Sequence, residues 1–258
     1  MFEKIKCFIL DMDGTIYLGN ELFSFTKDFL KKVKETGREY YFFTNNSSKS
    51  QQDYIEKLER FGIRIKRQQM MTSTHVISRY LKQHYEGKSV YVLGTPSLIQ
   101  EFKYFDMNLT EEDPDIVVLG FDTTLTYEKL SKACHYIRNG CIYFGINPDW
   151  NCPMEGGAFI PDCGSIAKLI EASTGRFPEF FGKPSKHTLD YIIQETGYEP
   201  DEIAIVGDRL YTDIAVADQS DVTSILVLSG ESTREDVKTS DVKPNVILED
   251  LSEITKML

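Results

Sequence analysis

The sequence has few positive charges and no long apolar run, and each shortage excludes a class of protein. It contains 29 lysine and arginine residues against 40 aspartate and glutamate residues, which gives a net charge of −11. A protein that grips nucleic acid or an anionic membrane through its phosphates needs the opposite balance, so we expect neither partner. No segment approaches the length of a membrane span, and the apolar run at the N-terminus is too short for a signal peptide.

Cysteine is also scarce. The five cysteines are odd in number, and no two of them have the CxxC spacing that zinc and redox motifs use. We therefore expect reduced thiols, as in a cytoplasmic protein. What the chain does have is apolar material: 41% of its 258 residues are hydrophobic, which is enough for one large α/β domain or for one domain inserted into another.

Both ends of the chain alternate between short apolar strands and amphipathic helices. The first run, at 5–10, is continuously apolar, as in a strand that is buried on both faces of a parallel sheet. Near the end of the chain the alternation of strands and helices is expected to resume with a short strand that ends at Phe180 and Phe181. The predicted strands lie at 5–10, 40–43, 202–206, 223–228 and 246–248, and the helices at 25–36, 49–61 and 186–196.

The middle of the chain has strands and helices of its own. The strands are predicted at 89–93, 115–119 and 141–145, and the helices at 126–138 and 165–174. The pattern indicates an α/β fold, a doubly wound, Rossmann-like parallel sheet interrupted by an inserted α/β cap. We assign residues 1–72 and 179–258 to the catalytic core domain and residues 73–178 to the cap.

Unusual polar residues lie in four loops beside the strand ends of the outer domain. FILDMDGTIYLG carries Asp11 and Asp13, the next strand ends in TNNSS, GKP precedes the helix at 186–196, and GDRLYTD follows the strand at 202–206. The carboxyl ends of parallel strands share one edge, where ligands bind, so we expect these loops to converge.

The acidic residues in these loops suggest a metal. Asp11 and Asp13 would repel each other unless a cation lay between them. They could be turn residues alone, because Asp and Gly are common in turns. Together with Asp208, however, they offer the hard oxygen ligands that Mg²⁺ prefers. Donors from TNN and a positive charge from Lys183 would then suit the transfer of a phosphoryl group.

DMDGT, TNN, GKP and GDRLYTD, in this order, resemble the four motifs of the haloacid-dehalogenase-like phosphatases. The large insertion between the second and third motifs is similar to that of the nitrophenyl- and sugar-phosphatase branch, and the resemblance covers nearly the whole chain. It implies a Mg²⁺-dependent phosphatase that hydrolyses a small phosphate monoester through an aspartyl-phosphate. Relatives with this insertion are often dimeric, so the resemblance also points to a homodimer.

The resemblance implies a role for each motif residue. Asp11 would be the nucleophile, and Asp13 would protonate the leaving oxygen and then accept a proton from water. The metal would be held by Asp11, the backbone carbonyl of Asp13 and Asp208. Asp213 would orient metal waters or the motif lysine. The phosphate would be bound by Thr44, Asn45, Asn46 and Lys183.

Plainer interpretations stay open for several residues. Asn46 could be a turn or helix-capping residue, Asp213 an acid of a first helical turn, and Lys183 a solvated surface lysine. The segment 145–165 is long for a loop in a compact domain. It is either an ordered surface loop or a specificity element in which two residues bind the leaving group: Asn147 and Asp149.

Three other functions are compatible with parts of this pattern. A signalling receiver module is about half this length and orders its acids differently, and a non-catalytic binding protein would not need Asp13. A phosphotransferase or mutase that uses the same phospho-aspartate stays open as the alternative. The motifs do not choose among sugar phosphates, nucleotides, glycerol-type phosphates and aryl phosphates as substrate.

Overall fold

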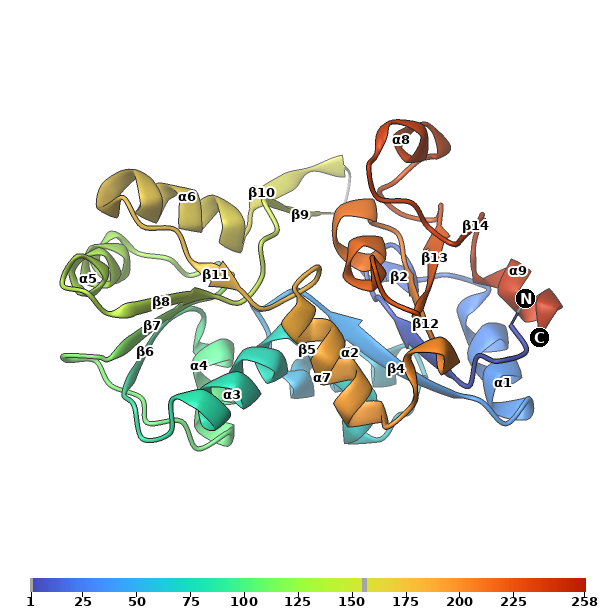
Figure 1. Ribbon diagram of the computed structural model, residues 1–258, viewed down its shortest axis with the longest axis horizontal. Coiled ribbons are helices and arrows are strands. Elements are labelled where there is room, and N and C mark those ends of the chain that lie inside the picture. The colour runs from blue at the N-terminus through green and yellow to red at the C-terminus, as the bar shows by residue number, and fades with distance from the viewer. Residues whose placement is uncertain (1, 155–156) are drawn as a thin grey trace. The chain divides into compact units, whose positions relative to one another are not determined.

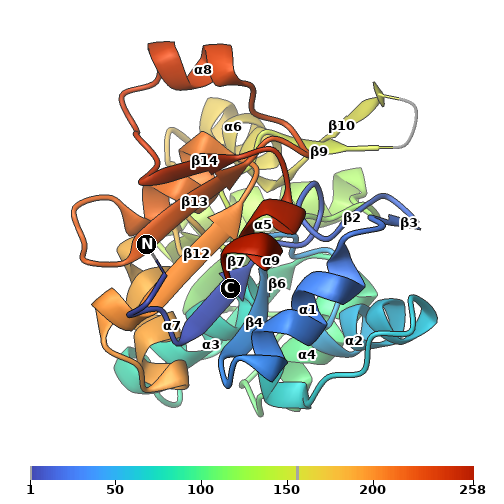
Figure 2. The same cartoon turned by 90° about the vertical axis from the view of Figure 1, so that its right-hand side faces the viewer.

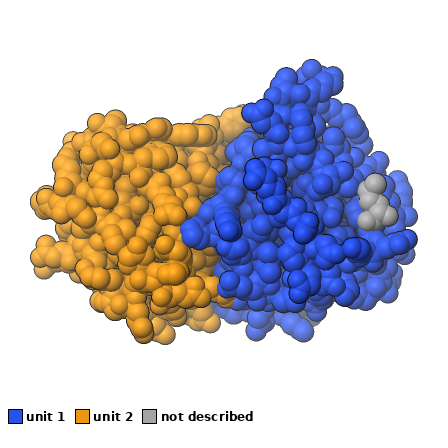
Figure 3. All heavy atoms as spheres, viewed as in Figure 1, with its two compact units in different colours: residues 1–44, 55–71, 183–258 blue, residues 45–54, 72–182 orange. Residues whose placement is uncertain are grey.

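The computed structural model describes residues 2–154 and 157–258, which form two compact units. Unit 1 comprises residues 1–44, 55–71 and 183–258, and unit 2 comprises residues 45–54 and 72–182 (Figure 3). Each unit is built on its own sheet of strands with helices packed against it. The predicted fold class, an α/β architecture with a Rossmann-like core, is confirmed.

Unit 1 contains a six-stranded sheet in the order β14-β13-β12-β1-β4-β5. Figure 2 labels β14, β13, β12 and β4 among these strands. Its strands are β1 (Cys7–Leu10), β4 (Glu39–Thr44), β5 (Met70–Thr72), β12 (Ile203–Gly207), β13 (Thr223–Val227) and β14 (Val246–Leu248). Strand β1 is flanked in parallel by β12 on one side and by β4 on the other. All four of its residues are buried, as its continuous apolar run predicts. Strands β1, β4 and β12 therefore end at the same edge.

Within the described residues, five helices accompany this sheet; α1 and α9 contact its strands, whereas α8 buries none of its residues. They are α1 (Thr26–Glu35), α2 (Gln51–Arg60), α7 (Lys186–Thr196), α8 (Arg234–Thr239) and α9 (Leu251–Met257), and short 3₁₀ or π turns occur at Arg67–Gln69, Pro200–Glu202, Leu210–Ile214 and Ala215–Ala217. Helix α1 buries Phe29, Leu30 and Val33 and contacts β4 and α9. The hairpin of β2 (Tyr17–Leu18) and β3 (Glu21–Leu22) follows the DMDGT motif and was not predicted.

Unit 2 contains a four-stranded sheet in the order β11-β8-β7-β6. Its elements are β6 (Val90–Leu93), β7 (Ile116–Leu119), β8 (Ile142–Gly145), β11 (Glu179–Phe180), α3 (Ser73–His84), α4 (Pro96–Tyr104), α5 (Tyr127–Arg138) and α6 (Cys163–Thr174). Helices α5 and α6 lie on one face of the sheet, and α3 and α4 lie on the other (Figure 1). Strands β6 and β7 are buried throughout, as in a sheet covered on both faces.

Two predictions about the inserted region need correction. The short strand before GKP, β11, pairs in parallel with β8 and so belongs to the sheet of unit 2, not to the outer sheet. The segment 145–165 is not a plain loop, because it contains an antiparallel hairpin of β9 (Asn151–Pro153) and β10 (Phe159–Pro161). Residues 155–156 of that segment lie outside the described residues. Among the described helices, none has the length and apolar composition needed to cross a membrane.

Candidate active site

Asp11 lies at the end of the central strand of unit 1. Its backbone N–H donates to the carbonyl of Val206 at 2.8 Å, so the strand pairing runs up to the carboxylate. The chain then turns through Gly14, whose φ of +88° favours glycine. A Cβ at Gly14 would lie 2.3 Å from Oδ2 of Asp208, so only glycine lets this turn approach the acid. Asp13 is half-buried in the same turn.

Lys183 connects the nucleophile candidate to the fourth motif. Its Nζ donates to Oδ1 of Asp11 at 2.6 Å and to Oδ1 of Asp213 at 2.5 Å. A longer bond of 3.4 Å reaches the carbonyl of Phe43 near the end of β4. The lysine is only 2% exposed. It is therefore a buried charge that two carboxylates share, and the alternative of a solvated surface lysine is wrong.

Three acidic residues form what we call the carboxylate cluster: Asp11, Asp208 and Asp213. One oxygen from each lies within 4.8 Å of the others. Asp213 Oδ2 accepts a hydrogen bond from the backbone N–H of Arg209 at 3.0 Å, and Asp208 Oδ2 accepts one from the backbone N–H of Glu231 at 2.7 Å. Asp208 Oδ1 is buried and has no hydrogen-bond partner among the described residues. An orphaned buried oxygen of this kind calls for a ligand.

Burial and mutual repulsion shift the acid–base properties of this cluster. Burial, reinforced by the charge of Asp213, raises the pKa of Asp11 to about 7 despite the opposing effect of Lys183. Burial and the charges of Asp11 and Asp213 likewise raise the pKa of Asp208. Burial alone would lower the pKa of Lys183, but the two carboxylates outweigh it and leave that pKa above its ordinary value. The lysine therefore remains charged at neutral pH.

The carboxylate cluster fits a divalent cation. Its three acidic groups outnumber the basic side chains whose charge acts on them, Lys183 and Arg209. Its ligand atoms are carboxylate oxygens, the kind that Mg²⁺ takes. A cation bound to Asp208 Oδ1 would satisfy the orphaned oxygen and offset the repulsion that raises the acidic pKa values. Asp11 and Asp208 could therefore hold a metal ion.

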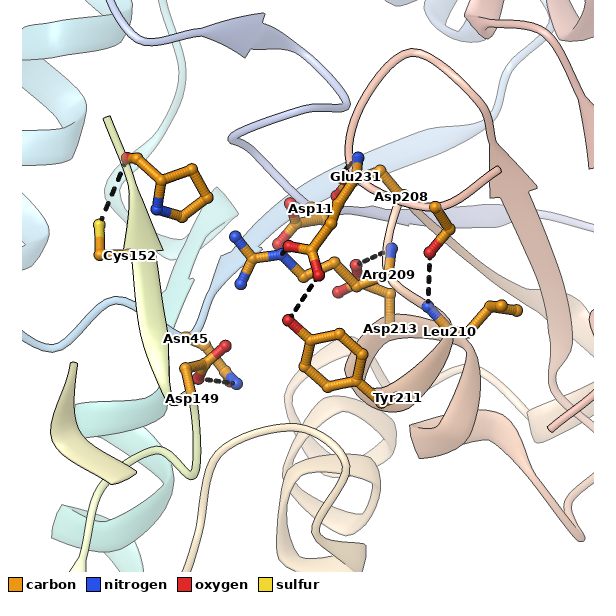
Figure 4. A network of polar contacts seen from close by, with 12 residues as sticks. Asp11, Asn45, Asp149, Cys152, Asp208, Arg209, Leu210, Tyr211, Asp213 and Glu231 are labelled. Atoms are coloured by element: carbon orange, nitrogen blue, oxygen red, sulfur yellow. Dashed lines mark hydrogen bonds and ion pairs between the residues drawn. The ribbon is translucent and has the colours of Figure 1, made fainter. Parts of the chain in front are cut away.

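A side-chain bridge that the sequence analysis missed lies beside the cluster. Figure 4 shows the carboxylate of Glu231 between Arg209 and Tyr211. Glu231 Oε2 is 3.0 Å from Nε of Arg209, and Glu231 Oε1 accepts a hydrogen bond of 2.9 Å from the hydroxyl of Tyr211. Arg209 and Tyr211 stand in the GDRLYTD motif, but Glu231 lies in a segment without any motif. No periodicity or spacing in the sequence singles it out.

The TNN motif spans the boundary between the two units. Thr44 is the last residue of β4 and is buried in unit 1, whereas Asn45 and Asn46 belong to unit 2. Asn46 Oδ1 accepts hydrogen bonds from the backbone N–H of Ser48 at 3.0 Å and from its hydroxyl at 2.7 Å. Asn46 therefore holds a turn with Ser48, which is one of the plainer roles that the sequence allows it.

Within unit 2, five buried polar residues form what we call the amide network: Asn45, Ser47, Asn147, Asp149 and Asp162. Asp149 Oδ2 accepts hydrogen bonds of 2.9 Å from the amides of both Asn45 and Asn147 (Figure 4 shows the first). Asn147 also donates to Asp162 Oδ1 at 3.0 Å and accepts from the hydroxyl of Ser47 at 2.6 Å. Asn147 is 0% exposed and Asp149 is 3% exposed. The two cap residues predicted from sequence are therefore held inside unit 2.

The structure thus sorts the predicted residues into two groups. It brings Asp11, Lys183, Asp208 and Asp213 together in unit 1, and it brings Asn45, Asn147 and Asp149 together in unit 2. Asp162 was not predicted. Its signal was available, since an aspartate directly before a helical segment is a common N-cap, and its side chain caps α6 by accepting from Cys163 N–H.

Comparisons with known proteins identify the family of the chain. The sequence pattern described as "Haloacid dehalogenase-like hydrolase" matches residues 8–108, and a second, HAD-hydrolase-like pattern matches residues 180–254. An acid sugar phosphatase from Staphylococcus aureus (strain MRSA252) is 34% identical over 252 residues, which cover 97% of each chain.

Solved structures resemble the whole chain. The 4-nitrophenylphosphatase of Thermotoga maritima is 42% identical in sequence and superposes with a TM-score of 0.95. The superposition covers 99% of this chain and 98% of that one. NagD from the E. coli K-12 strain is 30% identical, with a TM-score of 0.88 over 96% of this chain and 98% of that one. The chain therefore belongs to the haloacid dehalogenase-like hydrolase family, and it is an enzyme of the family's phosphatase branch.

Proposed function

We propose that this enzyme is a Mg²⁺-dependent phosphatase that hydrolyses a small phosphate monoester through an aspartyl-phosphate on Asp11. The observation that carries the proposal is the carboxylate cluster, in which Asp11 is held by the buried Lys183 beside the orphaned oxygen of Asp208. The relatives support the substrate class, since those with a named activity are an acid sugar phosphatase and nitrophenyl phosphatases.

Asp11 is the proposed nucleophile because one of its oxygens is fixed and the other is available. Lys183 holds Oδ1, whereas Oδ2 accepts no hydrogen bond from the described residues. The Asp11 carboxylate would attack phosphorus while the bond from phosphorus to the leaving oxygen breaks. The positive charge of Lys183 would favour the ionised form of Asp11 and would lie next to the developing phosphoryl charge.

Asp13 is the proposed general acid and base. It would give a proton to the leaving oxygen, which departs as an alcohol, and would then take a proton from the water that attacks the aspartyl-phosphate. That second step breaks the bond between Asp11 and phosphorus, releases inorganic phosphate and restores both carboxyl groups. Because Asp13 stands in the same tight turn as Asp11, one loop would carry both functions.

Mg²⁺, when bound, would supply positive charge to the phosphate oxygens. We propose that it is held by Asp11, the backbone carbonyl of Asp13 and Asp208. Asp213 would act indirectly, because both of its oxygens are already engaged: Oδ1 by Lys183 and Oδ2 by the backbone of Arg209. The position of Lys183 would thus depend on two acids, the reacting Asp11 and the non-reacting Asp213.

Binding of the phosphate is assigned to the second and third motifs: Thr44, Asn45, Asn46 and Lys183. We propose that Asn147 and Asp149 contribute to substrate binding through Asn45, since Asp149 accepts the amide hydrogen bonds of both asparagines. The inserted residues 73–178, which make up most of unit 2, would then act as a cap that contributes to substrate selection. The cysteines form no disulfide among the described residues, and we propose that the enzyme is cytoplasmic.

A screen for phosphate release tests this function. The full chain is offered sugar phosphates, nucleotides, glycerol phosphates and nitrophenyl phosphate, with Mg²⁺ or with a chelator, and with no added acceptor. We expect release that needs Mg²⁺. Transfer only when an acceptor alcohol is present would instead identify a phosphotransferase or mutase. Full activity in the chelator would contradict the metal requirement.

A further inference from the structure

The loop that follows β13 contacts both the first-motif loop and the fourth-motif loop. The hydroxyl of Ser229 donates to the carbonyl of Gly14 in the first motif at 2.7 Å. The backbone N–H of Ser232 donates to the carbonyl of Asp208 in the fourth motif at 3.0 Å. Residues 229–232 therefore connect the turn that follows the nucleophile to the metal-ligand candidate.

Glu231 makes the most specific of these contacts. Its backbone N–H donates to Asp208 Oδ2 at 2.7 Å. Both oxygens of its carboxylate contact side chains of the same motif (Figure 4). One lies 3.0 Å from Nε of Arg209, and the other accepts a hydrogen bond of 2.9 Å from the hydroxyl of Tyr211. One residue thus holds the metal-ligand candidate with its backbone and the two neighbouring motif side chains with its carboxylate.

The space around Asp208 shows that this contact is tightly fitted. A Cβ at Gly230 would lie 2.0 Å from Asp208 Oδ2, and a Cβ at Gly14 would lie 2.3 Å from the same atom. The Asp208 carboxylate therefore packs closely between the backbones of Gly14 and Gly230. Its Oδ2 is directed toward Glu231 N–H, and its Oδ1 is left buried without a hydrogen bond from the described residues.

We propose that Glu231 is a positioning residue for the metal site. By holding Arg209 and Tyr211, its carboxylate fixes the backbone N–H of Glu231 on Asp208 Oδ2, so that Asp208 presents Oδ1 to the cation. The inference rests on the proposed Mg²⁺-dependent function. Groups that orient metal ligands typically change metal affinity about 10- to 100-fold when they are removed. An ordinary exposed ion pair, by contrast, contributes little to the stability of the fold.

The test measures Mg²⁺ binding to the full chain by isothermal titration calorimetry, without substrate. We expect Glu231→Ala to raise the Kd for Mg²⁺ about 10-fold. Turnover at saturating Mg²⁺ should stay within about threefold of wild type, because the reacting groups are untouched. Glu231→Gln keeps one acceptor oxygen and Tyr211→Phe removes one donor, so both should give smaller increases in Kd. The matched control is Glu249→Ala, which breaks an exposed ion pair with Arg234.

Each outcome decides the inference. A wild-type Kd in Glu231→Ala, or lost turnover without a change in Kd, would overturn it while leaving the proposed function intact. A wild-type chain that binds no Mg²⁺ would overturn the inference together with the metal requirement. If Glu231→Ala fails to fold by circular dichroism, the other two variants decide. Raised Kd values in Glu231→Gln and Tyr211→Phe support the positioning role, and unchanged values contradict it.

Discussion

The carboxylate cluster and the amide network are both buried and both rich in carboxylates, but their hydrogen bonding differs. In the amide network the acids Asp149 and Asp162 accept from neutral amide groups, and no buried side-chain nitrogen or oxygen among its members lacks a partner within the described residues. In the carboxylate cluster Asp208 Oδ1 lacks one, and a lysine is shared between Asp11 and Asp213.

We expect this difference to separate residues that take part in the reaction from residues that maintain the structure around them. A buried acceptor without a partner costs about 1–3 kcal/mol, and a cation bound to Asp208 Oδ1 would offset that cost. Amides that donate hydrogen bonds to buried acids fix the local conformation, and no ligand is needed to complete the hydrogen bonding. We therefore expect substitutions in the carboxylate cluster to abolish turnover and substitutions in the amide network to alter binding and stability.

The largest effect is expected for Asp11→Asn. The amide is neither a nucleophile nor a strong metal ligand, and it is nearly the same size as the acid, so the fold should survive. Phosphate release should fall by more than about 10⁴-fold, beyond the range typical of losing a general acid or base. Asp218→Asn, at an exposed acid of the same unit, is the control and should keep full activity. Turnover above about a hundredth of wild type, with normal circular dichroism, would remove Asp11 from its role.

A smaller and substrate-dependent effect is expected for Asp13→Asn. Formation of the aspartyl-phosphate from an alkyl monoester should slow about 100-fold or more, because an alkoxide leaves poorly without a proton. Nitrophenolate leaves readily, so the same step with nitrophenyl phosphate should slow much less. Single-turnover measurements compare the two substrates. Equal losses on both would argue against Asp13 as the acid.

In the amide network, Asn147→Ala and Asp149→Ala should raise KM and re-rank substrates, with a smaller change in kcat. Each removes a partner from a buried group, so each should also cost about 1–3 kcal/mol of stability. Asn139→Ala, at an exposed asparagine of unit 2, is the control. The measurements are a metabolite panel and denaturant unfolding. An unchanged ranking with unchanged stability would break the contrast between the two regions.

The smallest effect concerns pH and the metal-free protein. Unfolded Asp11 releases its proton near its ordinary pKa of 3.8, whereas the folded protein keeps it until about pH 7. Between these values the unfolded state binds fewer protons, so stability should fall as the pH rises, by at most about 1.4 kcal/mol per pH unit from this group. Melting temperatures in a chelator measure the slope. Asp11→Asn should flatten it, and a slope unaffected by that substitution would contradict the raised pKa.

Much of the fold was predictable because strands buried on both faces are continuously apolar. The helix at 186–196 and the strand at 246–248 have the predicted limits, and β1 is shorter than predicted. Strand β11 was assigned to the wrong sheet because two residues carry no information about which neighbour they pair with. The hairpin within 145–165 was missed because each of its strands has only three residues.

The site was predictable where a motif places chemistry at a strand end, as for Asp11 and Asp208. It was not predictable where the contact is made only by the folded chain. Glu231 is distant in sequence from Asp11 and resembles any surface acid until its loop is seen against Asp208. Likewise, the burial of Asn147 and its bonds to three other side chains depend on packing that no local pattern encodes.

The central claim is that Asp11 carries the phosphoryl group, and trapping it is the most direct test. The Asp13→Asn variant, which should hydrolyse the intermediate slowly, is mixed with nitrophenyl phosphate and Mg²⁺, quenched in acid and reduced with borohydride. We expect intact mass spectrometry to show one added phosphoryl group before reduction, and peptide mapping to show homoserine at position 11 afterwards. Phosphate release without any phosphorylated protein, or with the group on another residue, would contradict the account.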